Sequence, residues 1–182
     1  MKLITVSKRG LSIKTSFPFL SRRSIPTFFQ ILTATAPSAN DCFNEANRLL
    51  KKNGILVVQD RTPEDCLLPG DESHLRGYFF ELYPHLRNKD ISRRYSAQDM
   101  KLALESAGFQ LEKTVKLWET RRHYSNLDSL QKDLLLRTGR SILHELTDEE
   151  LNRLAKFIES KLQHQSSIIE KDRWTVWFAR KK

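Results

Sequence analysis

The spacing of apolar residues is clearest where a helical segment passes into a strand. Ala46, Leu49 and Leu50 fall on one side of this segment, and charged residues fall on the other. Asn53, which precedes a glycine, tolerates the left-handed backbone that ends a helix. The apolar run at residues 55–58 then predicts a strand that is buried on both faces, as in a parallel α/β sheet.

The same order of helix and strand recurs later in the chain. Ser96 is a favourable N-cap residue, apolar residues follow it at helical spacing, and Gly108 ends the segment. Apolar residues within 109–117 predict a strand directly afterwards. The sequence WTVWFA at 174–179 predicts one more strand near the end of the chain.

Helical patterns fill the stretches between the predicted strands. One apolar stripe at helical spacing, interrupted by Pro84, consists of Leu75, Tyr78, Phe79, Leu82 and Leu86. This stripe either lines an apolar pocket or packs in a core. Farther on, Asn126 or Ser125 can cap a second helix, and Thr147 with Glu150 forms a capping box for a third.

In this order and spacing, the segments resemble the late part of class I S-adenosylmethionine-dependent methyltransferases. In that family a helix with the pattern E…R+LKPGG leads into the fifth strand, LLEEAGF precedes the sixth, and the last strand is antiparallel. Residues 96–108 are similar to the second pattern, and residues 174–179 to the last strand. The first pattern is matched by Glu45, Arg48, Leu49, Leu50, Lys51, Lys52, Asn53 and Gly54. The substrate cap of related small-molecule enzymes carries RSxLxxLTDEEL, matched here by Arg140, Ser141, Leu143, Leu146, Thr147, Asp148, Glu149, Glu150 and Leu151.

The resemblance implies an α/β fold with a partial Rossmann-like sheet. We expect about three strands, the last of them antiparallel, together with helical cap segments. Residues 41–182 would form the C-terminal half of a methyltransferase-like domain, and residues 1–40 a basic segment that is poorly ordered. The resemblance also implies S-adenosylmethionine as the cofactor and a small molecule as the methyl acceptor.

The cofactor-binding half of the family is missing from the sequence pattern. In that half a DxGxGxG turn lets the backbone approach the cofactor, and an acidic residue after the second strand binds the ribose, as in dinucleotide sites. No two glycines are adjacent or separated by a single residue, and the first acidic residue is Asp41. We therefore assign no cofactor-binding residue. We expect the isolated chain to be truncated and inactive, or to depend on a partner.

Charge is distributed unevenly over the 182 residues, which carry a formal net charge of +9. Residues 1–40 hold six Lys or Arg and no Asp or Glu, and residues 41–182 show no obvious focused basic patch of the kind that nucleic-acid binding needs. Cys42 and Cys66 lack CxxC or metal-ligand spacing, which favours free thiols in a reducing cytosol. No apolar run approaches the length of a membrane span.

Three interpretations of residues 1–40 remain open. The segment is Arg- and Ser-rich and acid-free, which is typical of an organelle-targeting leader. It could instead be a poorly ordered arm that binds an acidic surface. In the third interpretation it is sequence unrelated to the family, fused to a truncated domain. We expect a cytoplasmic protein, with an organelle as the alternative location.

Candidate substrate-binding residues come from three places. Asp60 and Arg61 end the strand at 55–58, and ligands of open α/β folds bind at the carboxyl ends of strands. The aromatic residues within and next to the apolar stripe at 75–86 contribute Tyr78, Tyr83 and His85. The cap region contributes Arg121, Tyr124 and Arg140. The alternatives are a solvated turn, core packing and ion-paired arginines, respectively. We assign no catalytic residue and no metal ligand.

The predicted function is methyl transfer from S-adenosylmethionine to a small molecule. One alternative is a non-catalytic remnant or interaction module whose exposed sheet edge recruits a protein by strand addition. A nucleic-acid binder with a basic tail is a further alternative, and the least favoured. Besides the methyl acceptor, we expect the partner to be a second copy of the chain or a complementing chain.

Overall fold

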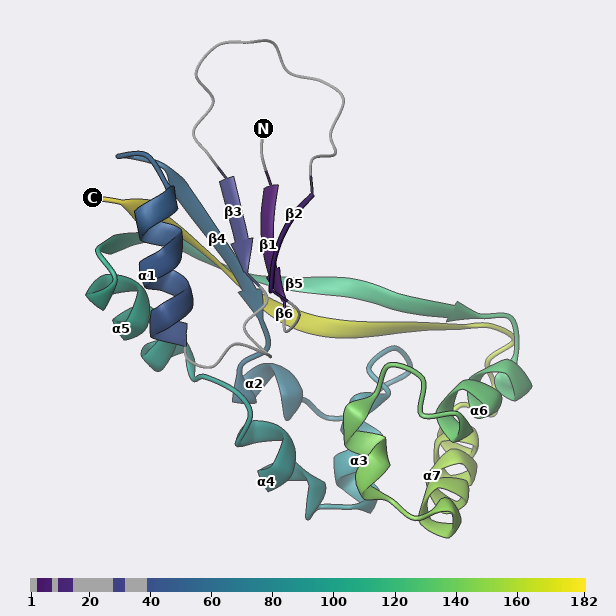
Figure 1. The fold of residues 1–182 in the computed structure, drawn as a ribbon. Helices are drawn as coiled ribbons and strands as arrows, with labels where there is room; N and C mark the ends of the chain where they lie inside the picture. The colour runs from purple at the N-terminus through teal and green to yellow at the C-terminus, as the bar shows by residue number, and fades with distance from the viewer. Residues whose placement is uncertain (1–2, 8–9, 15–27, 32–38) are drawn as a thin grey trace. The chain divides into compact units, whose positions relative to one another are not determined.

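A computed structural model describes residues 39–182, together with the backbone of residues 3–7, 10–14 and 28–31 (Figure 1). The strands are β1 (Leu3–Ser7), β2 (Gly10–Lys14), β3 (Phe28–Ile31), β4 (Ile55–Asp60), β5 (Phe109–Tyr124) and β6 (Ile168–Lys181). The helices are α1 (Ala39–Leu49), α2 (Pro63–Cys66), α3 (Arg76–Leu82), α4 (Leu86–Ile91), α5 (Ala97–Ser106), α6 (Leu127–Leu135), the 3₁₀ helix η1 (Ser141–Glu145) and α7 (Asp148–Lys161).

The strands form one Rossmann-like sheet in the order β2-β1-β3-β4-β6-β5. Strands β1, β3 and β4 are parallel to one another, and β6 is antiparallel to β4. The predicted strands correspond to β4, β5 and β6, and the antiparallel direction of the last one is confirmed. Strands β1 to β3 were not predicted, because residues 1–40 have no clean hydrophobic period. Most of the predicted N-terminal segment lies outside the described residues.

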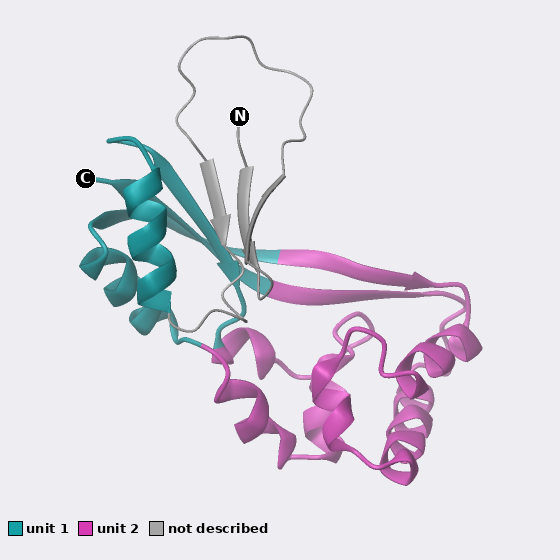
Figure 2. Cartoon of the chain, in the orientation of Figure 1, with its two compact units in different colours: residues 1–62, 95–117, 174–182 teal, residues 63–94, 118–173 magenta. Residues whose placement is uncertain are grey.

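The chain divides into two compact units, which are described separately (Figure 2). Unit 1 comprises residues 1–62, 95–117 and 174–182, and unit 2 comprises residues 63–94 and 118–173. This division does not coincide with the predicted boundary near residue 40, which remains a prediction. Among the described residues, no helix is both long and apolar enough to cross a membrane.

The core of unit 1 lies where helices α1 and α5 cover strands β4 and β6. Its buried residues are Ala39, Phe43, Ala46, Leu50, Leu56, Val58, Met100, Leu104, Ala107, Phe109, Trp177 and Ala179. Asn53 ends the turn after α1 with a φ of 63°, as the sequence predicts. Gly108 follows α5 with a φ of 82°, which favours glycine. The N-cap predicted at Ser96 is confirmed, and Asp99 completes a capping box with it.

The core of unit 2 is formed mainly by helices α3, α6 and α7 with the start of β6. Its buried residues are Leu75, Tyr78, Phe79, Phe80, Leu86, Tyr124, Leu130, Leu134, Ile142, Leu143, Leu146, Leu151, Leu154, Ile158, Leu162 and Ile168. The predicted caps are confirmed: Asn126 accepts the Ser129 N–H at 2.9 Å, and Thr147 forms a capping box with Glu150. The aromatic stripe of α3 therefore packs in this core.

Candidate functional site

The carboxyl end of β4 carries two of the predicted site residues. Asp60 is only 2 % exposed, and it lies opposite Thr175 of β6 in the antiparallel ladder. Its Oδ1 accepts the backbone N–H of Arg61 at 2.7 Å. The Arg61 guanidinium lies 4.6 Å from the centre of the Trp174 ring, at cation–π distance. This end of the strand is therefore an ordered polar site.

Three further residues complete this site in unit 1, and the sequence analysis missed them. The Lys116 ammonium of β5 donates to Thr175 Oγ1 at 2.7 Å and to Thr62 Oγ1 at 3.4 Å. Thr62 and Thr175 are fully buried. Lysine only donates hydrogen bonds, so both hydroxyl oxygens accept from it. Thr175 lies beside the end of β4 because β6 pairs with β4. The spacing of residues in the sequence does not reveal that pairing, so the sequence alone could not identify these residues.

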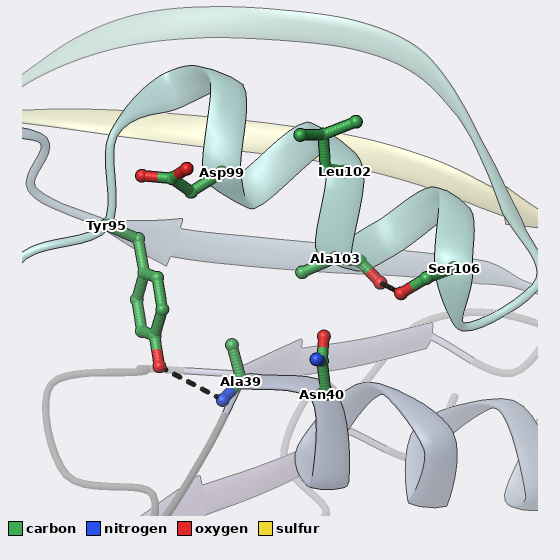
Figure 3. A pocket seen from close by; sticks show the side chains of 7 residues that line it. All are labelled: Ala39, Asn40, Tyr95, Asp99, Leu102, Ala103 and Ser106. Atoms are coloured by element: carbon green, nitrogen blue, oxygen red, sulfur yellow. Dashed lines mark hydrogen bonds between the residues drawn. The ribbon is translucent and has the colours of Figure 1, made fainter.

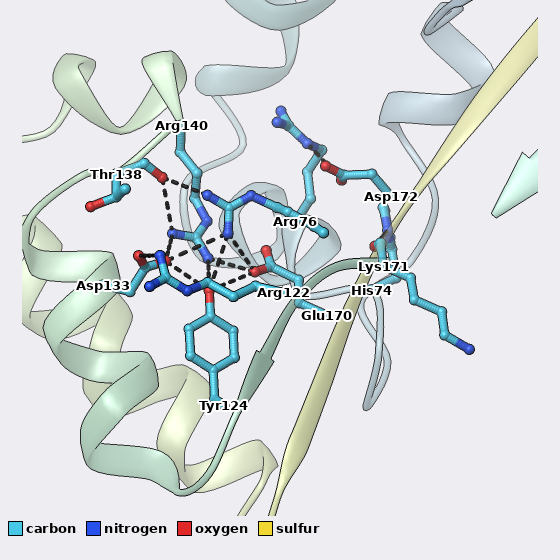
Figure 4. A network of polar contacts seen from close by, with 11 residues as sticks. His74, Arg76, Arg122, Tyr124, Asp133, Thr138, Arg140, Glu170, Lys171 and Asp172 are labelled. Atoms are coloured by element: carbon cyan, nitrogen blue, oxygen red, sulfur yellow. Dashed lines mark hydrogen bonds and ion pairs between the residues drawn. The ribbon is translucent and has the colours of Figure 1, made fainter. Parts of the chain in front are cut away.

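A second polar site lies in unit 2, where Tyr124 and Arg140 meet two buried carboxylates (Figure 4), and Arg121 also belongs to it. Arg140 is 2 % exposed, and its guanidinium donates to Asp133 at 2.6 Å and to Glu170 at 2.7 Å. Arg121 donates to the same Glu170 oxygen at 2.8 Å. The sequence analysis predicted Arg121, Tyr124 and Arg140 as site residues, but it predicted neither of the two carboxylates. The structure thus brings these three predicted residues together.

The Tyr124 hydroxyl lies at the centre of this network. It is 2.7 Å from Asp133 and 2.9 Å from Glu170, and it accepts from Arg140 at 2.9 Å. A phenol has one proton, so it donates to one carboxylate at a time. Burial raises the pKa of Tyr124 far above its ordinary value and keeps the hydroxyl protonated. Burial also works to raise the pKa of Asp133, but hydrogen bonds from Tyr124 and Arg140 and the nearby arginine charges outweigh it, so the pKa is lowered.

The remaining predicted residues lie elsewhere in unit 2. Tyr78 belongs to the core, and its ring meets Phe157 edge-on with centroids 6.1 Å apart. Tyr83 is half-buried and donates its hydroxyl to the Glu150 carbonyl at 3.0 Å. His85 is exposed, with its ring 5.9 Å from that of Tyr83. A substrate-binding role for these residues, and for the two polar sites, remains a prediction.

Unit 1 also contains an open pocket of about 460 Å³ between α1 and α5 (Figure 3). Its lining residues are Ala39, Asn40, Tyr95, Asp99, Leu102, Ala103 and Ser106. The Tyr95 hydroxyl accepts the Ala39 N–H at 3.3 Å, and Asp99 belongs to the capping box of α5. Much of the polar surface of the pocket is therefore already engaged in hydrogen bonds at the N-terminal ends of α1 and α5.

Residues 39–182 do not fit the adenosyl cofactor that the family resemblance implies. Such a site needs glycines with open space, so that a ligand can approach the backbone. All five glycines within residues 39–182 instead lie against the chain's own atoms: Gly54 against Lys51 and Leu50, Gly70 against Tyr78, Gly77 against Gly70, Gly108 against Asn47 and Gly139 against Arg121. In the same part of the chain, no cluster of three His, Cys, Asp or Glu side chains could hold a metal ion.

A scan against protein-family models and a search of curated proteins found no match. Among solved structures, the chain is similar to a provisionally assigned methyltransferase from Bacillus halodurans, with a TM-score of 0.43 and 20 % identity over 85 % of this chain and 68 % of that one. It is also similar to geranyl diphosphate C-methyltransferase from Streptomyces coelicolor A3(2), with a TM-score of 0.39 and 15 % identity. That match covers 86 % of this chain and 47 % of the enzyme.

A third similar structure is a provisionally assigned sarcosine dimethylglycine methyltransferase from Galdieria sulphuraria, with a TM-score of 0.37 and 17 % identity. That match covers 85 % of this chain and 52 % of the other protein. The chain resembles the class I methyltransferases. It spans about half the length of the Streptomyces and Galdieria proteins.

Proposed function

We propose that this chain contributes the acceptor-binding part of an S-adenosylmethionine-dependent methyltransferase that acts on a small molecule. One observation carries the proposal: β4 ends in a buried aspartate, Asp60, at the carboxyl edge of a Rossmann-like sheet. Ligands of open α/β sheets bind at this edge. The sequence motifs around β4 and β5, which resemble the methyltransferase family, support the same conclusion.

In this proposal, the chain binds and orients the methyl acceptor at the end of β4. Asp60 holds the backbone of Arg61, and two buried threonines hold the ammonium of Lys116. Polar groups that are already fixed before binding lose little entropy when a ligand arrives. Orientation of the reactants accounts for a large share of the rate in transfer reactions, so a catalytic triad is not required here.

The donor would be held by residues from outside 39–182, because the glycines of this range leave no space for it. Calorimetric titration of the purified chain with S-adenosylmethionine tests this point. We expect no saturable heat from the chain alone. Stoichiometric binding by the isolated chain would overturn the need for a partner, while leaving the methyltransferase assignment in place.

A chimera tests the assignment itself. The part of the Streptomyces coelicolor geranyl diphosphate C-methyltransferase that binds S-adenosylhomocysteine would be fused in front of residue 39, and a second chimera with the residues that contact this ligand replaced is the matched control. We expect the first chimera to bind S-adenosylhomocysteine and the control to fail. A chimera that folds by circular dichroism but gives no difference from the control would contradict a methyltransferase role for this chain.

One observation favours a second candidate, an interaction module without catalysis. Strand β5 is 16 residues long, lies at one end of the sheet and is exposed along most of its length. An edge strand of this kind can pair with a strand from another chain. Sedimentation equilibrium over a hundredfold range of concentration tests the self-paired form. A single monomeric species throughout would exclude pairing between copies.

A further inference from the structure

His74 is a buried histidine in unit 2 that belongs to neither polar site. It is 1 % exposed, and its Nδ1 lies 3.2 Å from the backbone carbonyl of Lys171 on β6. The N–H of Lys171 in turn donates to the carbonyl of Ser73 at 2.8 Å. The two bonds together attach residues 73–74 to one position of β6. Figure 4 shows the imidazole beside Lys171.

The contacts of the ring decide its protonation state. A carbonyl only accepts, so the contact with Lys171 assigns the proton of the neutral imidazole to Nδ1. The other nitrogen, Nε2, is buried and has no hydrogen-bond partner. The ring meets Trp118 edge-on, with centroids 5.5 Å apart and an interplanar angle of 76°. A proton added at Nε2 would therefore be a buried charge without an acceptor, which is costly.

The charged groups around His74 do not remove this cost. Asp71 uses Oδ1 to accept the backbone N–H groups of Ser73 and His74, both at 2.7 Å. The hydrogen bond to Lys171 and the charges of Asp172 and Asp71 favour a charged ring, whereas Arg76, which lies 3.6 Å from the Asp172 carboxylate, opposes that charge. Burial is the largest influence, and it lowers the pKa of His74 below its ordinary value.

We propose that His74 is an acid-sensitive latch that holds residues 71–74 on β6 at neutral pH and releases them when the imidazole is protonated. The released ring exposes Nε2 to water, whereas the attached residue is buried. Release stays local, because Gly70 and Gly77 are packed against each other at the start of α3. The latch depends on contacts within unit 2 and does not rest on the proposed methyl transfer.

The sign of the pH effect follows from the lowered pKa. The attached state prefers the neutral ring, so attachment is strongest above the ordinary histidine pKa of about 6.5 and weakens as the pH falls below it. If the attached ring stays neutral, acidification from pH 7.5 to 5.5 increases the fraction released by up to about tenfold.

Hydrogen exchange of the Lys171 amide measures the release directly, because this N–H donates to Ser73. After correction for the intrinsic rate, we expect its protection in the full chain to fall by up to about tenfold between pH 7.5 and 5.5. His74→Gln keeps a donor and cannot titrate, so its protection should not change over this range. His85→Gln, at an exposed histidine, is the matched control and should behave as the unmodified chain.

Titration of the His74 ring signals by NMR supplies a second measurement that needs no variant. The pKa should lie below 6.5, and Lys171 should lose protection progressively between pH 6.5 and that pKa. Constant protection of Lys171 across the range would overturn the proposal. An equal loss of protection in His74→Gln would overturn it as well, because the loss would then have another origin.

Discussion

Strand β6 passes through both units, and charged side chains are buried along it only in unit 2. In unit 1 its buried residues include Trp177 and Ala179, which pack against helices α1 and α5. In unit 2 they include Glu170 and Asp172, each paired with arginines. One continuous strand is thus stabilised by apolar burial in one unit and partly by enclosed ion pairs in the other.

The difference indicates which unit should lose more stability when a single side chain is removed. Apolar burial is non-directional and roughly proportional to area, so a core residue can be exchanged for a similar one at moderate cost. A buried ion pair has already lost its hydration, and removal of one member leaves an uncompensated charge. The network of Arg140, Asp133 and Glu170 should therefore respond sharply to single substitutions, and the core of unit 1 more gradually.

Replacement of the central arginine should give the largest effect. Arg140→Met keeps most of the side-chain volume but removes the buried cation that Glu170 and Asp133 share, so that only the more exposed Arg121 and Arg122 remain to pair with them. Breaking a buried pair in this way typically costs about 3–5 kcal/mol. Urea denaturation of the variant and the unmodified chain measures the change in free energy of unfolding.

Arg122 supplies the matched control, because it binds the same Asp133 at 2.7 Å from a side chain that is 52 % exposed. Arg122→Gln should cost less than about 1 kcal/mol, as exposed pairs do. Equal costs for the two substitutions would mean that burial does not determine the strength of this network.

A cavity in unit 1 should cost somewhat less and should respond differently to the solvent. Leu56 is fully buried between β4 and the covering helices, and Leu56→Ala should cost about 2–5 kcal/mol. Since no charge is involved, the cost should be the same at 0.05 M and 1 M salt. A strong salt dependence of the difference would refute the contrast between the two units.

Local structure was predictable wherever a short pattern determines it. The ends of α1, α5 and α7 follow from Asn53, Gly108 and the capping box at Thr147, and all of them are observed. These features depend on neighbouring residues alone, so the sequence contains the full physical cause. The antiparallel last strand was predicted only through resemblance to a family.

The partners of the predicted site residues could not be predicted, because they are far apart in sequence. Arg140 meets Glu170 across 30 positions, and Lys116 meets Thr175 across 59. A sequence pattern shows that an arginine is present but not whether a carboxylate will neutralise it. The same limit explains why the sequence left a pocket role open for Tyr78 beside the favoured core role, which the packing of α3 confirms.

Acid should weaken unit 2 more than unit 1, by a smaller amount than the substitutions above. The pKa of Asp133 is lowered in the folded chain, so its contribution to stability is complete above the unfolded value of about 3.9. That contribution is lost as the pH falls through the folded value. Hydrogen exchange at pH 5 and pH 3 should show protection lost first in α6 and α7. Loss that begins in α1 and α5 would contradict this assignment.

The helix caps should show the smallest effect and no difference between the units. Ser96 caps α5 in unit 1, and Thr147 caps α7 in unit 2, each through a capping box with an acidic residue three positions later. Because a cap satisfies backbone N–H groups locally, its strength does not depend on the core beneath it. Ser96→Ala and Thr147→Ala should each cost about 1 kcal/mol in urea denaturation. Costs that differ by more than about 1 kcal/mol would show that the surrounding core influences even these exposed bonds, and the contrast between apolar and ionic packing would then extend to the surface of the units.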